Sequence, residues 1–96
     1  MGETKRQLLL IVNPVSGTTS KAGMAEHIEE RLSRAGFDIH TEYTTCAGDA
    51  TRLARRAVEQ GCYGVLACGG DGTVNEVANG IIGYDNASMT VIPVGT

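Results

Sequence analysis

The chain has 96 residues, which allows at most one small domain with a single core and is below the usual size of a complete doubly wound α/β enzyme. Hydrophobic residues make up 42% of it, with no tryptophan and one phenylalanine, so we expect an aliphatic core rather than disorder. The formal net charge of −3 provides no overall positive field, which argues against nucleic acid as a partner and leaves any contact with anionic lipid to a local patch.

The cysteines and the apolar runs indicate in which cellular compartment the protein is expected. Cys46, Cys62 and Cys68 are odd in number and form no CxxC pair, which argues against a disulfide framework and against a zinc site. A reducing cytoplasm is the simplest location. The apolar run near the start is too short for a signal-peptide core, and no run approaches the roughly 20 residues that span a membrane.

The first predicted elements are a strand and a helix. Residues 8–12, LLLIV, are apolar at every position, which is typical of a strand covered on both faces, and the turn formers of residues 13–19 end it. Ser20 is the expected N-cap of a helix that Gly36 stops. The apolar residues at helical spacing in this helix are Ala25, Ile28, Leu32 and Ala35.

A second strand and a second helix follow. In residues 37–44 apolar side chains alternate with Asp38, His40 and Glu42, which predicts a strand with one wetter face that lies toward a sheet edge. Gly48 and Asp49 open the next helix and Gly61 closes it. Its inner face is expected to consist of Leu53, Ala54, Ala57 and Val58.

The last part of the chain repeats this alternation. Residues 63–68 form a buried strand, a glycine turn follows, and a third helix runs from Thr73, before a loop and a final strand at residues 89–92. The predicted inner face of the third helix comprises Val74, Val77, Ala78 and Ile81. The order β-α-β-α-β-α-β predicts an α/β fold, a three-layer sandwich with a mainly parallel sheet.

Glycine-bearing loops follow the strands at the edge where parallel sheets bind ligands. These loops are residues 13–17, 69–73 and 94–96, and the turn at residues 44–48 joins them. The amides of GGDGT, at the start of the third helix, are suited to an anion such as phosphate. Asp71 would repel a bare phosphate, so we interpret the loop as a site for a nucleotide with its Mg²⁺.

Two common phosphate-binding motifs do not fit. A Walker A loop needs GxxxxGK[ST], but GTTSKAGM has five residues between Gly17 and Gly23 and has Met24 in place of lysine. A dinucleotide fingerprint needs GxGxxG, but Asn75 occupies the place of the third glycine after Gly70 and Gly72.

The motifs NPVSG at residues 13–17, GGDGTVNEV at residues 69–77 and VIPVGT at residues 91–96 resemble those of diacylglycerol kinases and related lipid kinases, including sphingosine kinases and bacterial diacylglycerol kinases. The resemblance runs from about Leu8 to Thr96. It implies a Rossmann-like fold of the group that contains NAD kinases, diacylglycerol kinases and phosphofructokinases. By this resemblance the ATP site would be lined by Asn13, Pro14, Val15, Ser16, Gly17, Thr44, Gly69, Gly70, Asp71, Gly72, Thr73, Val74, Asn75 and Thr96.

The resemblance also implies how the protein acts. Asp71 would be the acidic catalytic residue, near Mg²⁺ or the acceptor hydroxyl, in the transfer of the ATP γ-phosphoryl to a lipid, with diacylglycerol as the first choice. Family members continue with a second, mostly β domain that supplies further metal ligands and contacts the lipid. We therefore expect residues 1–96 to be the N-terminal, nucleotide-binding part of a truncated catalytic domain, inactive when isolated.

Several alternatives stay open. GGDGT also resembles the loop of NAD kinases, and the chain could be a nucleotide-binding module without catalysis. The second predicted helix carries a cluster of three arginines, Arg52, Arg55 and Arg56. Such a cluster is usually the solvent-exposed face of a helix, but it could also contact an anionic inner membrane surface. An exposed sheet edge left by the absent half could pair two copies into a homodimer.

Overall fold

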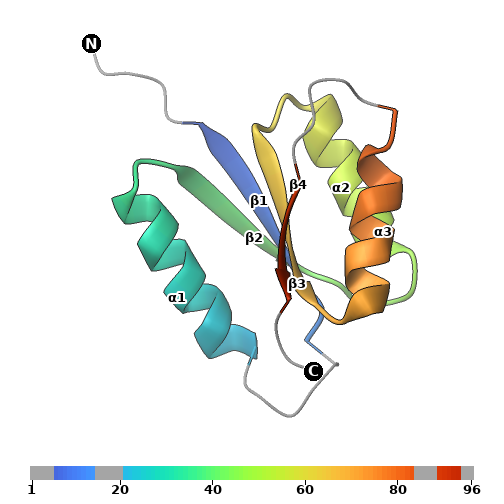
Figure 1. Cartoon of the computed structure of the whole chain (residues 1–96), viewed down its shortest axis with the longest axis horizontal. Helices are drawn as coiled ribbons and strands as arrows, with labels where there is room; N and C mark the ends of the chain where they lie inside the picture. Colours follow the sequence, from blue (N-terminus) through green and yellow to red (C-terminus); the bar gives the residue numbers. More distant parts are fainter. Residues whose placement is uncertain (1–5, 15–20, 84–88, 94–96) are drawn as a thin grey trace.

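The computed structural model describes residues 6–14, 21–83 and 89–93, and it has helices on both faces of a parallel sheet (Figure 1). The elements are β1 (Gln7–Val12), α1 (Lys21–Arg34), β2 (Asp38–Tyr43), α2 (Asp49–Glu59), β3 (Gly64–Gly69), α3 (Asp71–Ile81) and β4 (Met89–Pro93). The predicted order β-α-β-α-β-α-β and the α/β class are confirmed. Ser20, the expected N-cap of α1, lies outside the described residues.

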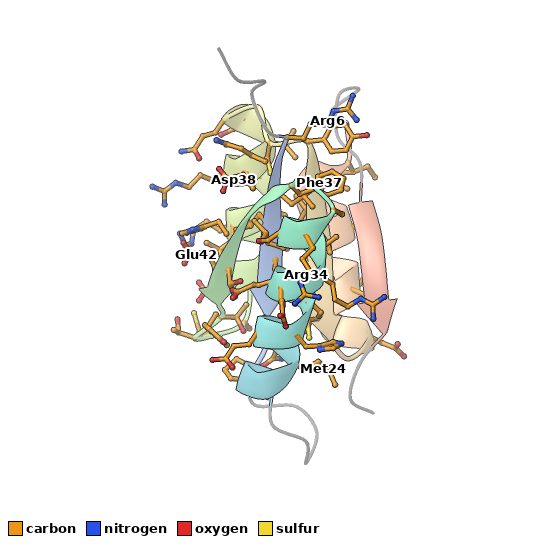
Figure 2. The ribbon with its side chains drawn as sticks, turned by 90° about the vertical axis from the view of Figure 1, so that its left-hand side faces the viewer. Arg6, Met24, Arg34, Phe37, Asp38 and Glu42 are labelled. Carbon is orange, nitrogen blue, oxygen red and sulfur yellow. The ribbon has the colours of Figure 1, made fainter. Side chains whose placement is uncertain are left out.

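The strands are ordered β2-β1-β3-β4, and every neighbouring pair is parallel. β1 is therefore central, with Leu9 opposite His40 of β2 on one side and Val65 of β3 on the other. β2 is an edge strand of this described sheet, as its alternating pattern predicts. Figure 2 shows Asp38 and Glu42 on β2, and both line a hollow together with Ala57 of α2.

Side chains that alternate along the strands divide the core into two parts. Ile11, Val65 and Ala67 face α2 and α3, while Leu10 and Cys68 face α1. Leu10 and Ile11 are both 0% exposed, which confirms that β1 is covered on both faces. The predicted inner face of α2 is confirmed, because Leu53, Ala54, Ala57 and Val58 are all buried in the part of the core beside α3.

Two helix boundaries differ from the prediction. Ala35 lies beyond the end of α1 and is exposed, because the chain turns there and Gly36 takes a φ of 100°, in the left-handed region that favours glycine. α3 begins at Asp71 rather than Thr73, so the second half of the expected glycine turn is the first turn of a helix.

The helices α2 and α3 pack closely at Gly80. A Cβ atom there would lie 2.5 Å from the carbonyl oxygen of Thr51 and 2.9 Å from the Cβ of Ala54, so only glycine allows this approach. The buried residues of α3 are accordingly Thr73, Val77 and Gly80, whereas three of the four predicted inner residues are only partly buried. Because α2 and α3 each follow a parallel strand, their amino ends lie at the same edge of the sheet (Figure 1).

Candidate functional site

The candidate site lies at the carboxyl ends of β1, β2 and β3, at the bottom of Figure 1. The backbone N–H of Asn13 donates to the carbonyl oxygen of Cys68 at 3.0 Å, and that of Thr44 donates to Val12 at 2.9 Å. These bonds continue the sheet by one residue past β1 and β2. The loops after the three strands therefore start side by side.

The amino end of α3 is open toward solvent. Gly70 is its N-cap, and among the described residues no side chain caps this end with a hydrogen bond. The backbone N–H of Val74 donates to Gly70, but the N–H groups of residues 71–73 precede the first possible acceptor within the helix. A Cβ at Gly70 or Gly72 would meet nothing within 4 Å, so an anion has room to approach these amides.

A tight contact fixes α3 against β1. A Cβ at Gly69 would lie 2.6 Å from Oγ1 of Thr73 and 3.3 Å from the Cβ of Asn13, so glycine is required there. Thr73 is only 6% exposed, and its hydroxyl oxygen accepts a hydrogen bond of 3.3 Å from Nδ2 of Asn13. Asn13 and Thr73 thereby link the end of β1 to the first turn of α3.

Asp49 shapes the loop between β2 and α2. Its carboxylate accepts hydrogen bonds from the hydroxyl of Thr45 at 2.6 Å, from the backbone N–H of Thr45 at 2.7 Å and from Arg52 at 3.1 Å. These bonds, those from Thr45 first, hold the pKa of Asp49 well below its usual range. Gly48, just before α2, has a φ of 89°, which completes the turn.

We expect Asp49→Ala to lower the free energy of unfolding at about pH 7, by an amount that shrinks as the pH falls below about 4. The folded-state pKa of Asp49 is lowered, so its stabilisation is present above the unfolded-state value of about 3.9 and is lost as the pH falls toward the folded-state pKa. Urea unfolding of wild type and variant across this range measures the difference.

Glu30→Ala is the matched control for this prediction, because it removes an exposed carboxylate that pairs with Arg34 on the surface of α1. Such exposed pairs contribute little to stability. A pH-independent loss in Asp49→Ala would contradict the assigned role of the carboxylate.

A cavity of about 320 Å³ lies between this loop and α3. It is lined by Asn13, Thr44, Thr45, Cys46, Ala47, Ala50, Gly72, Thr73 and Glu76. One carboxylate oxygen of Glu76 accepts a hydrogen bond of 3.1 Å from the backbone N–H of Gly48, and the hydroxyl of Thr51 donates to the carbonyl oxygen of Glu76 at 2.7 Å. Glu76 therefore connects the loop before α2 to α3.

A second, open hollow lies on the other side of the amino end of α3. It is lined by Asp71, Gly72, Val74, Asn75 and Ala78. Asp71 and Asn75 are exposed, and Gly72 borders both hollows. A ligand that extends from the cavity to Asp71 would pass Gly72, where no side chain intervenes.

Residues 7–96 match the family model described as the diacylglycerol kinase catalytic domain. The chain belongs to this family. Among its relatives, the diacylglycerol kinase of Bacillus subtilis (strain 168) is 42% identical over 88 residues, which are 91% of this chain and 29% of that protein. The diacylglycerol kinase of Staphylococcus saprophyticus is 39% identical over 96% of this chain and 30% of its own length.

The fold is also that of solved diacylglycerol kinase structures. The crystal structure of a diacylglycerol kinase from Bacillus anthracis str. Sterne has a TM-score of 0.82 and 31% identity, over 99% of this chain and 35% of that one. The chain thus spans about a third or less of the family members that it matches.

The described site residues expected from the family resemblance lie mainly at the cavity and at the open hollow beside α3. Asn13, Thr44, Gly72 and Thr73 line the cavity, whereas Asp71, Val74 and Asn75 lie at the open hollow. Gly69 is buried beneath Thr73, Gly70 caps α3, and Pro14 is exposed beside the loop. Val15, Ser16, Gly17 and Thr96 lie outside the described residues.

The sequence interpretation did not single out Glu76 or Ala50 as site residues. Only the i, i+3 spacing of Thr73 and Glu76, which places them on one face of a helix, could have indicated the role of Glu76. Within residues 6–14, 21–83 and 89–93, no three His, Cys, Asp or Glu side chains come close enough to hold a metal ion together. No helix in the same residues has the length and apolar character needed to cross a membrane.

Proposed function

We propose that this chain forms the ATP-binding part of a lipid kinase that transfers the γ-phosphoryl group of ATP to the hydroxyl of diacylglycerol. The observation that carries the proposal is the amino end of α3, with open space in front of Gly70 and Gly72, directly beside a cavity whose described lining is uncharged except for the carboxylate of Glu76. Diacylglycerol is chosen as the acceptor because the similar proteins of Bacillus subtilis and Staphylococcus saprophyticus are diacylglycerol kinases. A further domain of the longer relatives would bind the lipid.

Different residues of the chain would contact different parts of the nucleotide site. The N–H groups at the start of α3 would hold phosphate oxygens, assisted by the positive end of the helix dipole. The hydrogen bond between Asn13 and Thr73 would hold the end of β1 and the start of α3 in fixed positions around the nucleotide. Phosphoryl transfer depends on such positioning, because the protein contributes little covalent chemistry.

Asp71 fits a role beside Mg²⁺. Among the described residues that line the hollow at the first turn of α3, Asp71 supplies the one carboxylate, and Mg²⁺ in kinases is usually held by one or two carboxylates together with phosphates and water. Bound there, the cation would offset negative charge on the phosphates. Asp71 would also lie near the acceptor hydroxyl.

The test uses the complete protein with radiolabelled Mg-ATP and diacylglycerol in mixed micelles, and measures phosphatidic acid. We expect lipid phosphorylation that saturates with both substrates and no phosphorylation of NAD. Formation of NADP instead would assign the protein to the NAD kinases. Saturable nucleotide binding without either product would identify a binding module without catalysis.

A homodimer and transient contact with a membrane surface are further proposals. Arg55 and Arg56 are exposed on α2, as such contact would require. On β2, the charged side chains of Asp38 and Glu42 disfavour edge-to-edge pairing, so we propose that two copies would meet elsewhere.

A further inference from the structure

The loop between β2 and α2 forms one wall of the cavity. Thr45, Cys46 and Ala47 follow one another in the chain, and all three line the cavity. No helix or strand includes residues 44–48, so the shape of this wall depends on the hydrogen bonds that the loop makes. The side chain of Asp49 accepts two of these bonds.

Asp49 holds the loop through Thr45. A single carboxylate oxygen, Oδ2, accepts the backbone N–H of Thr45 at 2.7 Å and the hydroxyl of Thr45 at 2.6 Å. The backbone N–H of Asp49 in turn donates to the carbonyl oxygen of Cys46 at 3.2 Å. The chain from Thr45 to Gly48 therefore closes around the carboxylate, and both the backbone and the side chain of Thr45 are restrained.

The carboxylate that holds the loop lies outside the cavity. Asp49 is 8% exposed, and it is not among the described residues that line the cavity, whereas its neighbour Ala50 is. The other carboxylate oxygen, Oδ1, accepts a hydrogen bond of 3.1 Å from Arg52. Apart from its charge, Asp49 can therefore affect a ligand in the cavity only through the residues that it holds, and Thr45 is the one that it holds twice.

We propose that Asp49 is a positioning residue of the nucleotide site, which acts through Thr45 to fix the wall of the cavity before the nucleotide binds. The inference rests on the proposed function and adds to it a residue that does not touch the nucleotide. A loop that is ordered in advance allows tighter binding, because binding no longer has to restrict its conformations. The carboxylate contributes its oxygens to this role, whereas its negative charge repels the phosphates of ATP.

The simpler alternative is that Asp49 only stabilises α2. An acidic residue in the first turn of a helix interacts favourably with the helix dipole, and it does so through its charge. The two roles therefore depend on different properties of the side chain. Stabilisation of the helix needs the charge, while the bonds from Thr45 need an oxygen at the right position.

The test compares Asp49→Asn with Asp49→Glu, which separate charge from geometry. Asparagine lacks the charge but keeps an oxygen at the same position, and one amide oxygen can accept both hydrogen bonds from Thr45. Glutamate keeps the charge but carries its oxygens one methylene group farther along the side chain. Equilibrium dialysis of the complete protein with Mg-ATP measures Kd, and urea unfolding measures the stability of each variant.

We expect Asp49→Asn to bind Mg-ATP as tightly as the wild type or more tightly, and Asp49→Glu to raise Kd about 10-fold. Asp49→Ala, which removes both the charge and the oxygens, should raise Kd at least as much. Val58→Ala is the control for lost stability, because Val58 is 3% exposed in the core near the carboxyl end of α2. This control should unfold at lower urea concentration and keep the Kd of the wild type.

The possible outcomes separate the inference from the proposed function. A wild-type Kd in Asp49→Glu, or a rise in Asp49→Asn as large as in Asp49→Glu, would overturn the positioning role while leaving the nucleotide site intact. A rise in Val58→Ala equal to that in Asp49→Glu, at an equal loss of stability, would also overturn it, because lost stability alone would then explain the weaker binding. Absence of Mg-ATP binding by the wild type would remove both the inference and the proposed site.

Discussion

Replacement of Asp71 by asparagine is expected to lower kcat for lipid phosphorylation about 100- to 10,000-fold. The side chain is exposed on the first turn of α3, and asparagine has the same shape but no charge to place beside Mg²⁺ or the acceptor hydroxyl. The free energy of unfolding should fall by no more than about 1 kcal/mol, since the loss is confined to the interaction of the carboxylate with the helix dipole. Steady-state kinetics and thermal unfolding of the complete protein measure the two effects.

Asp38→Asn is the matched control, because Asp38 is also exposed but lies at the first residue of β2, at the opposite end of the sheet. It should keep wild-type turnover. Retention of most activity in Asp71→Asn would remove Asp71 from the mechanism, and a large loss of stability would mean that the carboxylate is structural.

The second large effect is expected for Gly80→Ala, which should lower the free energy of unfolding by about 1 to 3 kcal/mol or more. The added Cβ would meet the carbonyl oxygen of Thr51 at 2.5 Å and the backbone nitrogen of Arg55 at 3.2 Å. Backbone atoms of a helix cannot rotate away as a side chain can, so α2 and α3 must separate. Urea unfolding measures the loss.

Gly72→Ala tests this explanation in the same helix. A Cβ at Gly72 would meet nothing within 4 Å, and alanine is the better helix former by about 1 kcal/mol, so the variant should be as stable as the wild type or more stable. Because Gly72 borders the proposed phosphate site, the same variant should bind ATP less tightly. Equal stability of Gly80→Ala and Gly72→Ala would contradict the packing argument.

Most of the fold could be predicted from the spacing of apolar residues along the sequence, because this spacing decides which side chains are buried. The apolar runs of β1 and β3 are too short for helices and too apolar to face solvent. These two strands were therefore expected inside the sheet, covered on both faces. In the same way, four apolar residues at helical spacing identified the buried face of α2. Gly36, Gly48 and Gly61 end or begin helices at positive φ, where other residues are strained.

The start of α3 could not be predicted in this way. Two glycines flank Asp71 and each disfavours a helix by about 1 kcal/mol, so the local pattern indicates a turn. Tertiary contacts decide otherwise, because Thr73 is buried against Gly69 and bonded to Asn13. Gly80 is likewise a poor helix former, and only its approach to Thr51 explains its place.

The cavity depends on pairs of residues that are distant along the chain. Glu76 meets the N–H of Gly48, and nothing near either residue in the sequence indicates the other. The family resemblance identified the glycine loop and Asp71, but a polar residue on a helix face is usually solvated. The spacing of Thr73 and Glu76 places both on one face of α3, but the contact of Glu76 with Gly48 follows only from the packing of α2 beside α3.

The central position of β1 has a consequence for biosynthesis. β1 precedes the other described strands in the chain. Leu8 pairs with Ile39 of β2 on one side and with Gly64 of β3 on the other, so both edges of β1 are paired only after residue 64 has been synthesised. A ribosome adds about 5 to 20 residues per second, so the apolar segment waits for seconds with both edges unpaired. This apolar segment is therefore exposed to aggregation until β2 and β3 emerge and pair with it.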